Sequence, residues 1–207
     1  MRKNYALRSA RSGTGLLPPN PKQWENEHNG LDVRHELGLA LDIQLNHEDV
    51  FRLLPEVYVV PHGALEVPRD FADRFRGIKS GRWSVMCVPC PSGETLVLYN
   101  DSHPIRRIRA TLMEEFFHLW LGHPPTRLRV FSNSSAVRDF DAAKESEAYG
   151  SGAAALVPYK TLREMIQAKR PIRKIADHFD VSERLIEFRV KVTKLSRLLE
   201  KLNGVRS

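Results

Sequence analysis

The chain has 207 residues, of which 42% are hydrophobic and 28% are charged, and its formal net charge is +7. That balance is typical of a folded globular protein and excludes a fully disordered chain. No apolar run approaches the roughly 20 residues that a membrane-spanning helix needs, so we expect no membrane partner. The basic start lacks the apolar stretch of a secretory signal, and two cysteines are too few for a disulfide framework. The sequence therefore predicts a cytoplasmic protein.

The positive charge is concentrated toward the two ends of the chain. Residues 1–24 carry five basic residues and no acidic one, and residues 159–207 carry 13 basic and six acidic residues. Basic segments of this kind can bind nucleic acid or acidic protein surfaces, and they can equally form a solvated face with no partner. The charge alone fits both interpretations.

The first quarter of the chain is predicted to contain an arm, a helix and a strand. Glycines and prolines interrupt residues 1–24 and leave no apolar period, so we expect a flexible arm there. Leucines at near-helical spacing predict a helix over residues 31–54. The β-branched segment Val57–Val60 predicts a strand, and residues 69–76 predict a short helix.

The middle of the chain predicts a hairpin and a long helix. Residues 83–88 and 94–99 are rich in β-branched and aromatic residues, and the turn signal between them predicts a β-hairpin. The strongest helix signal spans residues 104–122, where large apolar residues recur at positions i, i+1, i+4 and i+5. A glycine and two prolines end that pattern, and residues 125–139 are predicted to be a loop or weakly ordered.

The last part of the chain is predicted to be helical. An Ala-rich helix is expected over about residues 141–156, and residues 159–202 predict three or more further helices. Residues 171–191 resemble a helix-turn-helix in which Ser182 caps the second helix. Acidic residues early in that second helix repel phosphate, which favours a structural or substrate-docking role over DNA contact. The basic residues of this helix that are candidates for substrate or DNA contact are Arg184, Arg189 and Lys191.

The helix predicted over residues 104–122 carries ionisable side chains on one side of an otherwise apolar surface. Glu114 and His118 lie about 40° apart on the helical wheel, and Glu115 is beside them. A pair at positions i and i+4 can chelate one cation, and an adjacent carboxylate can reach a metal-bound water. Glu145 and Glu147 of the next helix are acidic candidates for a third ligand. The same pattern also fits a solvated helix face.

The segment Arg106–His123, with Glu114-Glu-Phe-Phe-His118 and the ending Leu-Gly-His, resembles the metal-binding helix of the ImmA/IrrE metallo-endopeptidases. Residues 145–158 are similar to the second signature of that family, in which Glu-Ala-Asn is followed by small residues and Leu-Leu-Met-Pro. The resemblance covers about residues 50–195. It implies an α+β fold with a zincin-like minimal core, in which a small antiparallel sheet packs with the metal-binding helix, followed by a helix-turn-helix-like tail.

Carried over by position, the resemblance implies that Glu114, His118 and Glu147 bind one divalent metal ion and that Glu115 is the general base. Glu114 stands where the family has its first histidine. Two carboxylates and one imidazole make a harder and more anionic site, and they leave the metal less Lewis acidic. Zinc is the metal that the resemblance implies, and manganese or iron suits the altered ligand set.

The resemblance implies a metal-dependent endopeptidase whose substrate is a helix-turn-helix transcriptional repressor. Cleavage would derepress stress-response or mobile-element genes. The alternative is a catalytically inactive member of the family that acts as a repressor-binding or DNA-binding regulatory protein. Under this interpretation the chain divides into a flexible basic arm (1–24), a metallopeptidase-like domain (25–158) and a helix-turn-helix-like helical module (159–207).

Several other patterns carry weaker signals. The segment His35–Leu39 lacks a second histidine, so it is expected to be ordinary helix surface. His123 is expected to interact with the helix dipole, and the alternative is that it is an extra metal ligand. Tyr149 is expected to pack against the metal-binding helix, and the alternative is that it stabilises an oxyanion. Cys87 and Cys90 form the only C-x-x-C pair, which excludes a four-cysteine zinc ribbon. Redox sensing through these thiols is a third class of function, but their expected place in a strand favours inert thiols.

Overall fold

The computed structural model of the chain describes residues 20–64, 83–124, 128–130, 136–138, 141–202 and 204. The described residues form eight α-helices, five strands and one 3-10 turn, His62–Ala64. The helices are α1 (Pro21–Glu36), α2 (His47–Phe51), α4 (Ile105–Trp120), α5 (Ala142–Leu156), α6 (Tyr159–Gln167), α7 (Ile172–Phe179), α8 (Glu183–Val192) and α9 (Ser196–Leu202). The strands are β1 (Val57–Pro61), β2 (Val85–Pro89), β3 (Thr95–Tyr99), β4 (Leu128–Val130) and β5 (Ala136–Arg138).

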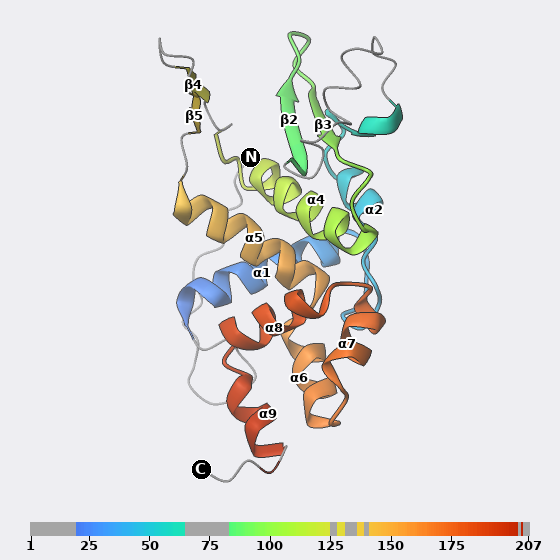
Figure 1. Ribbon diagram of the computed structural model, residues 1–207, viewed down its shortest axis with the longest axis vertical. Helices are drawn as coiled ribbons and strands as arrows, with labels where there is room; N and C mark the ends of the chain where they lie inside the picture. The colour runs from blue at the N-terminus through green and yellow to red at the C-terminus, as the bar shows by residue number, and fades with distance from the viewer. Residues whose placement is uncertain are drawn as a thin grey trace.

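A three-stranded sheet with the order β1-β3-β2 lies at one end of the molecule (Figure 1). The predicted hairpin is confirmed, because β2 and β3 pair antiparallel with Cys87 opposite Val97. The predicted α+β class is also confirmed, but the sheet is mixed, because β3 inserts between the other two strands and pairs parallel with β1. Strand β2 is therefore an edge of this sheet.

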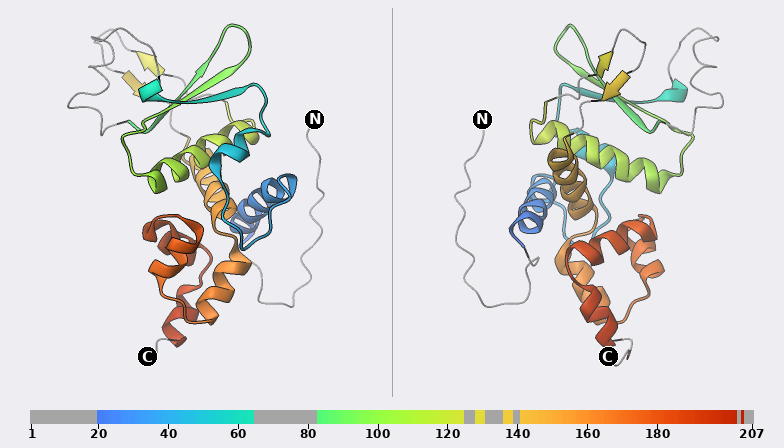
Figure 2. Two further views of the ribbon diagram at one scale, coloured as in Figure 1. Left: turned by 90° about the vertical axis from the view of Figure 1, so that its right-hand side faces the viewer. Right: turned by 60° about the vertical axis from the view of Figure 1, so that its left-hand side comes forward.

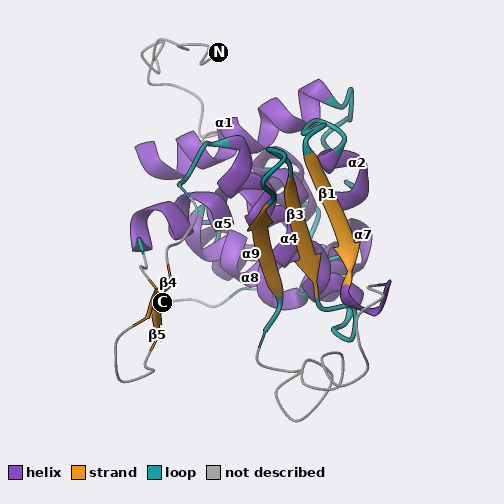
Figure 3. Cartoon of the chain, turned by 90° about the horizontal axis from the view of Figure 1, so that it is seen from above, coloured by secondary structure: helices purple, strands orange, loops and turns teal. Residues whose placement is uncertain are grey.

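Helix α4 packs under the sheet and connects it to the rest of the core. Figure 3 shows the three strands lying side by side across the helical layer that contains α4. Val97 at the centre of the sheet is fully buried, and so are the apolar residues of α4 that face inward. These α4 residues are Leu112, Met113, Phe116 and Phe117. The apolar period predicted from the sequence is thus the buried face of this helix.

Figures 1 and 2 show α5 lying against both α4 and α1. Glycines at the two crossings allow the helices to approach closely. A Cβ at Gly152 of α5 would lie 3.1 Å from the backbone carbonyl of Met113 in α4. A Cβ at Gly30 of α1 would lie 2.5 Å from the backbone nitrogen of Ala155 in α5. Only glycine permits this approach without a backbone shift. Helix α5 is therefore held against α4 at the level of the ionisable side chains.

The tail forms the predicted helix-turn-helix and docks on the body of the molecule. Asp180 ends α7 in the left-handed region with a φ of 49°, and the Ser182 side chain accepts a hydrogen bond from the Leu185 amide at the start of α8. The carboxylate of Asp180 pairs with Arg106 and Arg109 of α4. The proposed boundary between residues 158 and 159 stays a prediction.

The sequence prediction differs from the structure mainly in the first third of the chain. Helix α1 begins at Pro21, inside the segment predicted to be an arm, because the Asn20 side chain caps its first turn. The single helix predicted over residues 31–54 is wrong, since α1 ends at Glu36 and Gly38 reverses the chain with a φ of 61°. Residues 1–19 of the predicted arm and the helix predicted over 69–76 lie outside the described residues.

Strands β4 and β5 form an antiparallel pair within residues 125–139, so the loop predicted there is wrong for these six residues. Among the helices of the described residues, none combines the length and the apolar character that crossing a membrane requires.

Candidate metal centre

The candidate centre is built on the half-buried side of α4, in the last two turns of the helix. Buried apolar side chains orient this helix, so that Glu114, Glu115 and His118 lie half-buried between the core and the surface. The helix ends at Trp120, and Leu121 caps it before Gly122, which has a φ of 67°. The two sides of the helix thus separate its packing residues from its ionisable residues, as the sequence predicted.

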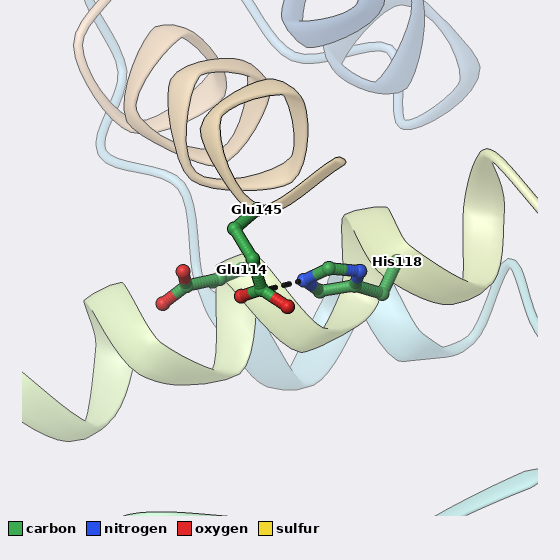
Figure 4. A group of neighbouring side chains, drawn as sticks. All are labelled: Glu114, His118 and Glu145. Carbon is green, nitrogen blue, oxygen red and sulfur yellow. Dashed lines mark ion pairs between the residues drawn. The ribbon is translucent and has the colours of Figure 1, made fainter. Parts of the chain in front are cut away.

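Three side chains from two helices converge at this place. Glu114 and His118 of α4 and Glu145 of α5 each bring one ligand atom to within 4.8 Å of the other two (Figure 4). The Nε2 atom of His118 lies 3.5 Å from Glu145 Oε2. Figure 4 shows Glu145 reaching from α5 to the pair on α4. Because α4 and α5 pack closely, they together supply one compact group of possible metal ligands.

The chemistry of this donor group fits a divalent metal ion. An imidazole nitrogen and two carboxylate oxygens are ordinary ligands of zinc, manganese and iron. The side chains of His118 and Glu145 are 18% and 30% exposed, so the group is sheltered but open to water. Three protein ligands leave coordination positions free for water or substrate, which is the arrangement of catalytic metal sites.

Glu115, the predicted general base, faces the sheet. The thiol of Cys87 on β2 donates to its Oε2 atom over 3.1 Å. Cys87 belongs to the inner face of the sheet, which is why it meets α4. Neither Cys87 nor Cys90 is in a disulfide, and the Cys90 thiol donates to the backbone oxygen of Val88 and not to the candidate centre. Sequence spacing gave no sign of this contact, because it joins a strand to a helix.

Glu147, the third ligand that the family resemblance implied, is not part of the converging group. Its Oε2 atom lies 3.1 Å from Nε2 of His123, and Nδ1 of His123 lies 3.0 Å from Nδ1 of His118. Residues two apart on a helix point about 200° away from each other, so Glu145 and Glu147 face different neighbours. The structure brings Glu145 to the group and turns Glu147 toward His123.

Tyr149 lies near the centre but packs on the tail. Its ring makes an edge-to-face contact with Phe188 of α8, with 4.8 Å between the ring centroids. Burial and then the negative charge of Glu114 raise the pKa of Tyr149, while Arg184 lowers it. The phenol is therefore protonated at neutral pH and can act as a hydrogen-bond donor.

The structure separates the three basic residues that were predicted to contact substrate or DNA. Arg184 and Lys191 are exposed on α8. Arg189 is completely buried, because its guanidinium donates to the Glu27 carboxylate and to the backbone oxygen of Val157. The prediction was wrong for Arg189, which is a structural residue.

Residues 78–191 match the family model Peptidase_M78, described as the IrrE N-terminal-like domain. The match covers more than half of the chain and includes α4, α5 and the helix-turn-helix. No curated protein and no solved structure matches the chain.

Proposed function

Because the chain belongs to the Peptidase_M78 family of IrrE N-terminal-like domains, we propose that it is a metal-dependent endopeptidase that acts through the group on α4 and α5. One observation carries this proposal: Glu114, His118 and Glu145 place their ligand atoms within 4.8 Å of one another. These three residues would hold the metal. The tetrahedral preference of zinc suits three protein ligands and one open position, and manganese or iron suits the two carboxylates.

The residues of the chain divide the proposed reaction between them. A bound divalent ion supplies Lewis-acid activation of water and of the peptide carbonyl. The Glu115 carboxylate takes a proton from the attacking water and passes it to the leaving amine, so that one water is consumed for each peptide bond. The thiol of Cys87 donates to one carboxylate oxygen of Glu115 and thereby orients it. The protonated Tyr149 phenol is a further donor near Glu114.

The proposed substrate is a helix-turn-helix transcriptional repressor, whose cleavage would derepress stress-response or mobile-element genes. An extended peptide can bind by adding to a sheet edge. Strand β2 is such an edge, and Met86 and Val88 on it are exposed. Exposed Arg184 and Lys191 on α8 offer a basic surface for docking a partner. A cytoplasmic location fits this role and fits two cysteines that form no disulfide.

A second candidate function is supported by one residue. Glu114 replaces the first histidine of the family pattern, which suits a member that has lost catalysis. Such a protein would act as a repressor-binding or DNA-binding regulator through its helix-turn-helix tail. The two functions differ in their dependence on Glu115, because only the peptidase needs a general base.

The test combines elemental analysis with cleavage. Purified wild-type protein should contain near-stoichiometric metal, His118→Ala should lose it, and Glu115→Gln should retain it. Cells that express Glu115→Gln should lack the repressor fragments that mass spectrometry finds with wild type. Exposed Glu187 supplies the control variant Glu187→Gln, which should match wild type in both assays. Wild-type protein that takes up no zinc, manganese or iron would overturn the peptidase in favour of the regulator.

A further inference from the structure

A second row of side chains lies behind His118, on the side away from the proposed metal. The Nδ1 atom of His118 is 3.0 Å from Nδ1 of His123, and the Nε2 atom of His123 is 3.1 Å from Oε2 of Glu147. The His123 side chain is only 8% exposed. We propose that His123 and Glu147 are positioning residues, which hold His118 in the tautomer whose Nε2 lone pair faces Glu114 and Glu145. The metal in this inference rests on the proposed function, whereas the tautomer of His118 rests on the hydrogen bonds alone.

The direction of the hydrogen bonds follows from which atoms carry protons. A carboxylate can only accept, so the contact with Glu147 requires a proton on Nε2 of His123. When His123 carries this proton alone, its Nδ1 atom has the lone pair, and the 3.0 Å contact is then a hydrogen bond donated by Nδ1 of His118. His118 is left with an unprotonated Nε2, which is the atom that lies 3.5 Å from Glu145. The relay thus specifies the form of His118 that can bind a metal.

The opposite tautomer would disable the group. A proton on Nε2 of His118 would point at the Glu145 carboxylate and occupy the lone pair that a metal needs. Hydrogen bonds from a carboxylate to a ligating histidine fix its ring orientation and make it a stronger ligand. Here the Glu147 carboxylate acts through the imidazole of His123. The ring orientation and the tautomer of His118 are therefore fixed by two residues that do not bind the metal themselves. Both nitrogens of His123 are used in this relay, which gives it a role other than that of a fourth ligand.

The end of α4 is shaped to place His123 in this position. Gly122 adopts a φ of 67°, and the His123 amide donates to the carbonyl of His118 over 2.9 Å. This is the helix-ending pattern in which the residue after a left-handed glycine folds back over the last turn. The chain reversal returns the His123 ring to His118, with 5.0 Å between the ring centroids. Helix α5 supplies Glu147 from the opposite side.

The test measures metal affinity and the His118 tautomer separately. His123→Phe keeps a ring but removes both nitrogens, and Glu147→Gln keeps the shape of the side chain but removes the charge. Both variants should bind zinc and cobalt(II) about 10–100-fold more weakly than wild type in chelator competition. Exposed Ser146, between the two glutamates of α5, supplies the control Ser146→Ala, which should bind like wild type. Circular dichroism checks that each variant is folded.

Nitrogen NMR of the His118 imidazole supplies the readout that a purely structural role would not move. In metal-free wild type at mildly alkaline pH, Nδ1 should carry the proton, and in His123→Phe and Glu147→Gln the proton should be found on both nitrogens. A wild-type proton on Nε2, or variants with unchanged tautomer and affinity, would overturn the relay while leaving the metal site intact. Wild-type protein without metal but with the expected tautomer would overturn the proposed function and keep the relay.

Discussion

Replacing Arg189 with Met should lower the free energy of unfolding by about 3–5 kcal/mol, because it leaves a buried carboxylate without its partner. Arg189 is 0% exposed and Glu27 is 3% exposed. Nη2 of Arg189 donates to Oε2 of Glu27, and Nε donates to the carbonyl of Val157 over 3.0 Å. The other Glu27 oxygen accepts from the Tyr159 amide over 2.6 Å. The pair therefore ties α1, the corner between α5 and α6, and α8 together.

The size of the effect follows from these contacts. Two charge-assisted hydrogen bonds disappear in Arg189→Met, and each such bond contributes about 1.5–3 kcal/mol. The Glu27 carboxylate, which would then have no arginine partner, can take up a proton. This limits the loss in the free energy of unfolding to about 3–5 kcal/mol, which is what breaking a buried ion pair costs. For a chain of this length, about 2–4 °C of melting temperature is lost per kcal/mol, so a decrease of about 6–20 °C is expected.

Urea and thermal unfolding followed by circular dichroism measure this change. The control is Arg184→Met, since Arg184 is exposed on the same helix, and its effect should stay within about 0.5 kcal/mol. A double variant, Glu27→Leu with Arg189→Met, should recover much of the loss, because no charge is then left buried. An Arg189→Met protein within about 1 kcal/mol of wild type would refute the assignment of this pair as a structural tie.

Three further predictions concern single positions. Gly152→Ala would place a Cβ 3.1 Å from the α4 backbone, so α5 must move away from α4. The free energy of unfolding measured in urea should therefore fall by about 1–3 kcal/mol, and metal binding should weaken. Burial, followed by the positive charge of a nearby arginine, lowers the pKa of His47 from its usual 6.5. Below pH 6.5 the unfolded chain therefore binds a proton at this residue more readily than the folded chain does, so the free energy of unfolding should fall as the pH drops. In thermal melts, the melting temperature of His47→Gln should fall less with pH than that of wild type. Cys87→Ala removes the donor to Glu115 and should reduce peptide cleavage at most about threefold, since thiols are weak donors, whereas Cys90→Ala should have no effect.

The elements that could be predicted from the sequence are those with local signals at both ends. Helix α4 has a strong apolar period between Pro104 and Gly122, and α5 begins after the capping Asp141. The helix predicted over 31–54 failed because the leucine spacing continues across Gly38, where the positive φ ends the helical path. The parallel pairing of β1 with β3 is a long-range contact, and no local pattern specifies it.

The candidate site was predictable to the extent that it lies on one helix. Glu114 and His118 follow from the i, i+4 period of α4. The choice between Glu145 and Glu147 depends on how α5 is rotated against α4, which the packing at Gly152 determines and the sequence does not display. The relay through His123 likewise needs the fold, although the Gly-His pair at the helix end was a usable signal for the chain reversal.

The identity of residue 114 is expected to affect which metal ion the proposed site prefers. In the proposed site it adds an oxygen ligand and a negative charge where a second imidazole would otherwise stand. Oxygen ligands suit manganese, whereas imidazole suits zinc, so the wild-type group should discriminate between these ions less than a two-histidine group. Glu114→His keeps the i, i+4 geometry with His118, because the backbone of α4 is unchanged.

We therefore expect Glu114→His to raise the ratio of zinc to manganese affinity by about tenfold or more. Equilibrium dialysis against equal concentrations of the two ions, followed by elemental analysis, measures that ratio directly. Glu114→Gln is the matched control, because it keeps the side-chain size and removes the charge, and it should weaken the binding of both ions. If the ratio of zinc to manganese affinity is the same in wild type and in Glu114→His, then the residue at position 114 does not bind the metal. In that case His118 and Glu145 hold the ion without a ligand at position 114.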